Sequence, residues 1–220
     1  YDNQFYNSVQ QGFDVSLRKR LIEIIEGRIS YSLVNQDFNQ FESVDVEQRL
    51  RSSIGTASKL NLLLLRDSRD RLINSLRGMR LELDMNYAGG FLGGDFDFYK
   101  VETRNAFYLP LSERLSQTVE FLARAGIVQE TGDSPVVPWE ERFFLGGPNT
   151  LRGFEFRDVS PLEGGFQSFG RPYEIGGKTY GMLGVEYSLG ITEDFRVAPF
   201  YDGGFVNKET GDFGLDEEKI

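Results

Sequence analysis

Apolar and polar side chains alternate through most of this chain, in runs of about ten residues. In residues 79–87, the apolar side chains at odd-numbered positions alternate with the polar side chains of Arg80, Glu82 and Asp84. Successive side chains of a β-strand point to opposite faces, so this period of two predicts strands with one apolar and one polar face. We therefore predict an all-β, antiparallel fold with eight strands, at residues 12–20, 28–35, 58–66, 79–87, 99–109, 118–127, 179–189 and 195–206. Pro199, inside the last strand, cannot donate to a ladder and predicts a bulge there.

Soluble β-sandwiches and transmembrane β-barrels both alternate in this way, so the pattern alone leaves both classes open. Opposed charges on the polar faces, such as Arg80 and Glu82, favour a barrel whose polar face lines a wet lumen. The connections favour a barrel too, because long ones at 36–57, 88–98 and 128–178 alternate with shorter ones at 21–27, 67–78, 110–117 and 190–194. Outer-membrane barrels have short periplasmic turns and longer outer loops. We therefore predict a transmembrane β-barrel with the long connections on the outer side.

Composition excludes several other classes of protein. No apolar run of 18 residues is present, which excludes a transmembrane helix. The 220 residues include no cysteine and no histidine, so a disulfide, a catalytic triad with histidine and a thiolate or histidine metal site are impossible within them. The net charge of -10 argues against a nucleic-acid partner. The start at Tyr1 lacks a basic and apolar leader, so we expect a mature or partial segment.

Acidic residues are numerous, and we predict no catalytic residue, metal or cofactor among them. Glu140 and Glu141 are adjacent, but with 34 carboxylates such neighbours are expected by chance. Asp67 and Asp70 lie close to Arg66 and Arg69 and fit a catalytic cluster only weakly, so we expect them to order a turn.

The segment 143–156, FFLGGPNTLRGFEF, interrupts the strand pattern with two glycine-containing turns. Gly146, Gly147 and Gly153 are expected to adopt positive φ or to allow close backbone approach. A phosphate-binding loop is the competing interpretation, but the Gly-Lys-Ser/Thr ending that it requires is absent.

The same segment resembles the signature loop of the BamA-like outer-membrane assembly factors, a superfamily that includes TamA, the two-partner secretion translocators and mitochondrial and plastid relatives. The superfamily pattern, (V/I/L)RG(F/Y) after a GG turn, is matched by Gly146, Gly147, Leu151, Arg152, Gly153 and Phe154. Three further matches follow the order of the superfamily: RDSRD with a later RG, AGGFLGGD, and FYDGG, at residues 66–78, 88–95 and 200–204.

The resemblance implies partners for the loop arginine. By parity, Glu186 and Asp202 point inward from the two strands that follow the loop, and they match the acidic partners of the arginine in the superfamily. Phe200 matches a packing neighbour. A buried arginine requires carboxylates and hydrogen-bond acceptors around it. We therefore expect Arg152 to pair with Asp202 and Glu186 and to hold the loop 128–178 inside the lumen.

The resemblance also implies an extent and a function. Barrels of this superfamily have sixteen strands, preceding POTRA domains and a terminal strand ending in an aromatic residue. We expect residues 1–220 to be a partial barrel domain, the sixth to thirteenth strands, without POTRA domains or terminal strands. The implied function is non-enzymatic: folding and insertion of β-barrel proteins into the outer membrane, with outer-membrane lipids, client barrels and accessory subunits as partners. A two-partner-secretion translocator is the alternative, and a passive porin a weaker one.

Overall fold

A computed structural model describes residues 2–3, 6–39, 53–112, 116–132, 136–163, 173–192 and 195–214 of the chain. Parts of the predicted connections 36–57, 110–117, 128–178 and 190–194 lie outside these ranges. No helix in the described residues is long and apolar enough to cross a membrane.

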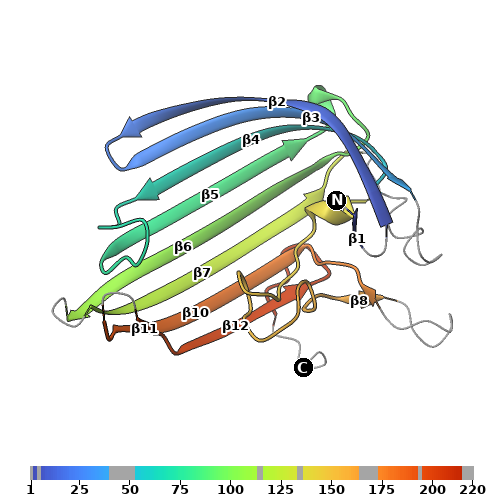
Figure 1. Cartoon of the computed structure of the whole chain (residues 1–220). Helices are drawn as coiled ribbons and strands as arrows, with labels where there is room; N and C mark the ends of the chain where they lie inside the picture. Colours follow the sequence, from blue (N-terminus) through green and yellow to red (C-terminus); the bar gives the residue numbers. More distant parts are fainter. Residues whose placement is uncertain are drawn as a thin grey trace.

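Ten strands form one curved sheet in which every neighbouring pair is antiparallel (Figure 1). Their order is β1-β2-β3-β4-β5-β6-β7-β10-β11, and β12 also pairs with β10. The predicted all-β, antiparallel class is therefore confirmed. The bounds are β1 (Asp2–Asn3), β2 (Tyr6–Ile22), β3 (Ile25–Asn39), β4 (Gly55–Asp67), β5 (Gly78–Ala88), β6 (Phe98–Ser112), β7 (Gln117–Glu130), β10 (Thr179–Gly190), β11 (Arg196–Val197) and β12 (Phe200–Asn207). Outside this sheet lie the 3₁₀ turns η1 (Gly90–Leu92) and η2 (Trp139–Glu141), and the paired strands β8 (Leu162–Glu163) and β9 (Tyr173–Glu174).

The last predicted strand is divided into β11 and β12, and the predicted bulge at Pro199 is wrong. Leu189 lies opposite Val197 and Glu186 opposite Phe200, so the register with β10 is the same on both sides of the proline. The proline has no N–H, but its carbonyl still accepts a hydrogen bond from the Tyr187 N–H at 3.0 Å. Pro199 therefore interrupts the ladder without inserting a residue.

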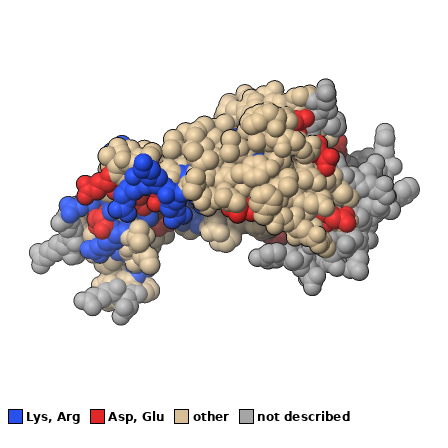
Figure 2. All heavy atoms as spheres, turned by 90° about the horizontal axis from the view of Figure 1, so that it is seen from above, with Lys and Arg blue, Asp and Glu red and all other residues tan. Residues whose placement is uncertain are grey.

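The two faces of the sheet differ in polarity, as the alternation predicts. One face, which we call the outer face, exposes large apolar side chains such as Leu17, Leu183 and Tyr201. Seen over β2 and β3, it is a broad surface with few charged side chains, and Lys and Arg gather at one end of it (Figure 2). The other, inner face carries the charged side chains along β5 and β6, among them Arg80 and Glu82, which form an ion pair of 2.7 Å.

The hydrophobic core lies between the inner face and the connection from β7 to β10. We call this connection, residues 131–178, the inner loop. It contributes Val137, Phe143, Leu145 and Leu151, all 6% exposed or less. The strands of the curved sheet, which we call the wall, contribute most of the rest of the cluster, which includes Ala88, Phe98, Val128, Tyr180, Met182 and Val206. The inner loop therefore supplies one side of the hydrophobic core.

Candidate functional site

The inner loop enters the core through Phe143, which packs against the wall where the wall has no side chain. The rings of Phe143 and Tyr180 lie 4.6 Å apart, centroid to centroid. A Cβ atom built on Gly126 of β7 would lie 2.7 Å from each of these rings. The backbone of Phe143 also pairs with Gly177 in both directions, each hydrogen bond 2.9 Å long. Glycine at position 126 therefore gives the aromatic ring its place.

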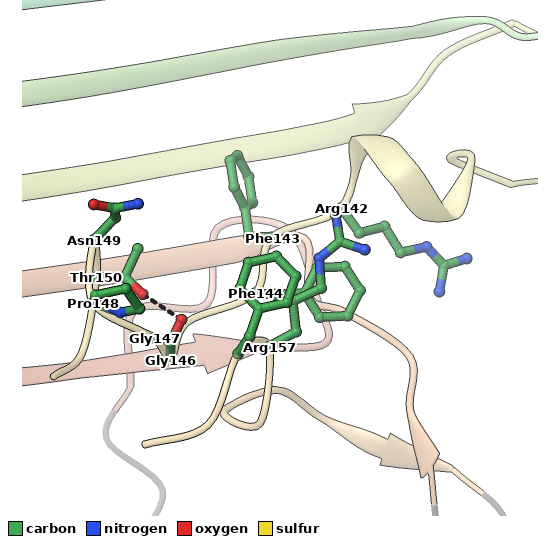
Figure 3. A pocket seen from close by; sticks show the side chains of 10 residues that line it. Arg142, Phe143, Phe144, Gly146, Gly147, Pro148, Asn149, Thr150 and Arg157 are labelled. Atoms are coloured by element: carbon green, nitrogen blue, oxygen red, sulfur yellow. Dashed lines mark hydrogen bonds between the residues drawn. The ribbon is translucent and has the colours of Figure 1, made fainter. Parts of the chain in front are cut away.

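A tight turn follows at Gly146 and Gly147, whose φ angles of 108° and 95° confirm the expected positive values. The Gly147 N–H donates to the Phe154 carbonyl at 3.0 Å, and the Thr150 hydroxyl donates to the Gly146 carbonyl at 2.8 Å. Figure 3 shows this turn, with the ring of Phe143 directed toward the wall strands. The Arg124 guanidinium on β7 donates to the Asn149 carbonyl at 2.7 Å, which fixes the turn to the wall.

Arg152 meets both predicted carboxylates. Its Nε and Nη2 donate to the two oxygens of Asp202 at 2.7 and 2.8 Å, and its Nη1 donates to Glu186. The Arg152 backbone N–H also donates to Asp202, at 3.3 Å. The guanidinium carbon lies 3.6 Å from the centroid of the Phe200 ring. The structure thus brings together the four residues whose contact the sequence predicts.

Burial gives these contacts their strength. The Asp202 side chain is 2% exposed and that of Arg152 24%. The hydrogen bonds to Asp202 raise the pKa of the Arg152 guanidinium, so it stays charged. Removing one member of a buried, bidentate pair leaves an uncompensated charge and costs about 3–5 kcal/mol. Arg152 is therefore a strong fixed point for the inner loop.

Two wall glycines make room for this site. Gly184 lies opposite Asp202 in the ladder, and a Cβ atom there would lie 2.9 Å from an Asp202 oxygen. A Cβ atom on Gly204 would lie 2.9 Å from Leu145. The remaining motif residues divide by exposure: Leu151 is buried, whereas Phe154 is 53% exposed. Gly153 has the expected positive φ, 94°.

The turn between β4 and β5 is ordered by its own acids, as the sequence predicts. Asp67 accepts two hydrogen bonds from the Arg69 guanidinium, at 2.9 and 2.7 Å. Asp70 accepts from the backbone N–H groups of Leu76 and Arg77 at 3.0 and 3.2 Å. No group of three or more carboxylates that could hold a metal occurs in the ranges that the structure describes.

Two further features of the inner loop are not predicted from the sequence. The Arg157 guanidinium lies over the rings of Trp139, Phe144 and Phe156, 4.6–5.3 Å from their centroids, beside a pocket of about 230 Å³ that Figure 3 shows. Glu141, which the sequence assigns to chance, is ion-paired with Lys59. A signal for that pair exists, because parity points Lys59 inward and its ladder partners, Ser32 and Ala88, are uncharged.

The chain is similar in sequence to known proteins over the strands and the inner loop described above. Residues 1–219 match the model of the Omp85 superfamily domain. The chain is 28% identical over 198 residues to outer membrane protein assembly factor BamA of Nitratidesulfovibrio vulgaris, covering 86% of this chain and 24% of that protein. It is 33% identical over 131 residues to the human sorting and assembly machinery component 50 homolog, covering 59% of this chain and 27% of that protein.

Among solved structures, the chain resembles BamA from Haemophilus ducreyi lacking POTRA domains 1–3, with a TM-score of 0.79 at 17% identity. That match covers 91% of this chain and 42% of the other, and it concerns the fold alone. The chain spans about a quarter of the length of the curated relatives it matches.

Proposed function

The chain belongs to the Omp85 superfamily, and from that premise we propose that its parent protein folds and inserts β-barrel proteins into the outer membrane. The observation that carries the proposal is the inner loop pinned to the wall by Arg152, Asp202 and Glu186. The names of the relatives, an outer-membrane protein assembly factor and a sorting and assembly machinery component, support the same function.

The bilayer sets the physical problem that such a protein solves. A strand that enters lipid with unpaired N–H and C=O groups loses several kcal/mol for each group. An assembly factor lowers this barrier by offering a sheet of its own, so the sheet must keep its curvature and register while a client folds. Arg152 contacts side chains on β10 and β12 together, and we propose that it holds this part of the wall in one arrangement.

The proposed partners follow from this role. They are outer-membrane lipids around the apolar outer face, client β-barrel proteins, and accessory subunits. The proposed activity involves no covalent chemistry and no cofactor. Positioning of a folding chain requires neither.

The test is the folding rate of a client β-barrel into liposomes that contain the full-length parent protein. Wild type, Arg152→Ala and Arg71→Ala are compared at equal protein levels. Arg71 is the matched control because its loss removes the same charge from a side chain that is 61% exposed. We expect wild type and Arg71→Ala to accelerate folding equally and Arg152→Ala to be slower by about tenfold or more.

If the wild-type protein does not accelerate folding at all, the proposed function is wrong. Export of a polypeptide through the same liposomes would then identify a translocator instead, and a steady high conductance would identify a pore.

A further inference from the structure

A second charged contact holds the inner loop, at η2, and its polarity is the reverse of that at Arg152. The Glu141 carboxylate lies 2.7 Å from Lys59 Nζ on β4 and 3.5 Å from Lys100 Nζ on β6. All three side chains are largely buried, with exposed fractions of 19%, 26% and 15%. Here the loop supplies the anion and the wall supplies the cations.

The wall itself offers these lysines no carboxylate directly across the ladder. Lys59 lies opposite Ser32 and Ala88, and Lys100 lies opposite Asn86 and Val128. Two inward cations in a partly dry interior require a counter-charge. Glu141 provides that charge from the loop.

Glu141 is held in place by its surroundings. Burial alone would raise the pKa of its carboxyl, but the charges of Lys100 and Lys59 hold that pKa below its ordinary value. The N–H of Trp139, two residues earlier, donates to the Ser53 hydroxyl at 2.8 Å. Lys100 Nζ also lies 4.8 Å from the centroid of the Phe143 ring, which joins the contact to the core.

The two charged contacts lie at the two ends of one segment. Residues 142–151 connect Glu141, which contacts β4 and β6, with Arg152, which contacts β10 and β12. Between them, Phe143 packs on Gly126 of β7. This segment therefore crosses the inner face as a strap with an anion at one end and a cation at the other.

We propose that Glu141, with Lys59 and Lys100, is a second contact that holds the inner loop on the wall. We call it the second seat, the first being Arg152 with Asp202 and Glu186. Glu141 is then a positioning residue that keeps the 142–151 strap on the wall. The role that we give it in client folding rests on the proposed function. The placement of the strap does not. Opposite polarity at the two seats also fixes direction, since a strap docked backwards would bring like charges together at both ends.

The test uses the full-length parent protein in liposomes and hydrogen exchange of peptides within residues 138–147. The backbone N–H groups of Phe143 and Leu145 donate to the carbonyls of Gly177 and Val159, and both residues are buried against the wall, so their exchange reports on release of the strap. We expect Glu141→Gln to exchange at least tenfold faster there and Glu141→Asp to stay close to wild type. Glu155→Gln is the matched control, because Glu155 is an exposed carboxylate of the same loop.

Charge reversal distinguishes loss of this specific contact from a general loss of folded structure. Glu141→Lys alone is expected to release the strap, and the triple variant Glu141→Lys, Lys59→Glu, Lys100→Glu to restore protection. If Glu141→Gln exchanges like wild type, or if the triple variant is as unprotected as Glu141→Lys, the second seat is wrong. A gel assay of heat-modifiability accompanies each variant. If a variant at Glu141 does not fold into a barrel, Lys59→Gln is measured in its place. Faster exchange is again expected for Lys59→Gln, and unchanged exchange would contradict the second seat.

Client folding is then measured on the same samples. We expect Glu141→Gln to lower the rate at saturating client while the client concentration at half-maximal rate stays the same. Hydrogen exchange is measured without a client, so the two proposals can fail separately. If Glu141→Gln releases the strap but no protein, wild type included, accelerates client folding, the proposed function is overturned and the second seat stands.

Discussion

The β4–β5 turn and the inner loop both contain arginine–aspartate contacts, but the contacts act over different distances along the chain. In the turn, Arg69 pairs with Asp67, two residues away. In the inner loop, Arg152 pairs with Asp202, which is 50 residues away, and Lys59 pairs with Glu141 across 82 residues. A local pair fixes the shape of its own turn, whereas a remote pair fixes where a loop lies. The same chemistry thus gives a rigid corner in one place and a docked strap in the other.

The largest expected effect comes from breaking the remote pair. Asp202→Asn leaves Arg152 without its bidentate carboxylate and should weaken docking of the inner loop by about 3–5 kcal/mol. Hydrogen exchange should be at least a hundredfold faster in peptides from residues 143–152 and unchanged in peptides from 67–78. Asp67→Asn should give the reverse pattern. Equal responses of both peptides to either variant would remove the distinction between the two regions.

Acidity should separate the two regions in opposite directions. Burial raises the pKa of Glu140 to about 7, and both of its carboxylate oxygens are buried. The carboxyl of Glu140 therefore binds its proton more tightly in the docked loop than in the released loop, where its ordinary pKa is 4.5. Docking should strengthen as pH falls from about 7 toward 4.5. The gain in protection of residues 138–145, corrected for intrinsic rates, should be on the order of a hundredfold, and Glu140→Gln should abolish it.

The β4–β5 turn should respond at lower pH and with the opposite sign. Although burial alone would raise the pKa of Asp70, hydrogen bonds from the N–H groups of Arg77 and Leu76 hold it below its ordinary 3.8. The stabilisation that this carboxylate gives is complete above that value and is lost as pH falls below it. Hydrogen-exchange protection of residues 67–78 should therefore fall at low pH. A rise in this protection on acidification would contradict the role given to Asp70.

A smaller effect is expected from filling the space under the strap. A Cβ atom on Gly126 overlaps the rings of Phe143 and Tyr180, so Gly126→Ala should weaken docking by about 1–2 kcal/mol. Gly203→Ala is the matched control on the same wall, because the nearest atom to its Cβ lies 3.9 Å away. The measurement is again exchange of residues 143–152. Similar effects of both alanines would show that wall flexibility, and not room for the strap, sets docking.

The smallest effect on docking is expected at Phe154. This motif side chain is 53% exposed, so Phe154→Ala should change docking by less than about 0.5 kcal/mol. Exchange and client folding are measured together. A large loss of client folding with unchanged exchange would mean that Phe154 acts on the client, and a large change in exchange would refute our account of the loop.

Much of the sheet could be predicted from sequence because burial on one face imposes the alternation. The ends of strands could not, since β2 begins at Tyr6 and passes through the neighbouring Gln10 and Gln11, where polar residues occupy both faces. A ladder continues there because backbone groups, and not side chains, form its hydrogen bonds. The bulge at Pro199 was a wrong inference for a related reason: loss of one donor removes one bond but does not move the register.

The candidate site was predictable where two sequence features converge on one contact. Arg152 lies in a motif and its carboxylates lie on strands whose inward parity is readable. Glu141 has neither a motif nor a strand around it, and its contact depends on the path of the loop over the wall. The two inward lysines were the available signal, since their ladder neighbours are uncharged.

The glycines beneath the strap have a consequence for how such chains change in evolution. Gly126 receives the ring of Phe143, and Gly204 receives Leu145, so volume on the wall and volume on the loop are shared at two points. A larger side chain at position 126 meets Phe143 of the loop and Tyr180 of the wall equally closely, so docking tolerates it only when both rings give way. At position 204 a Cβ atom also lies 2.8 Å from the Gly181 carbonyl oxygen, and no change at Leu145 relieves that contact. Across related sequences, positions 126, 143 and 180 should therefore vary together, whereas position 204 should stay glycine.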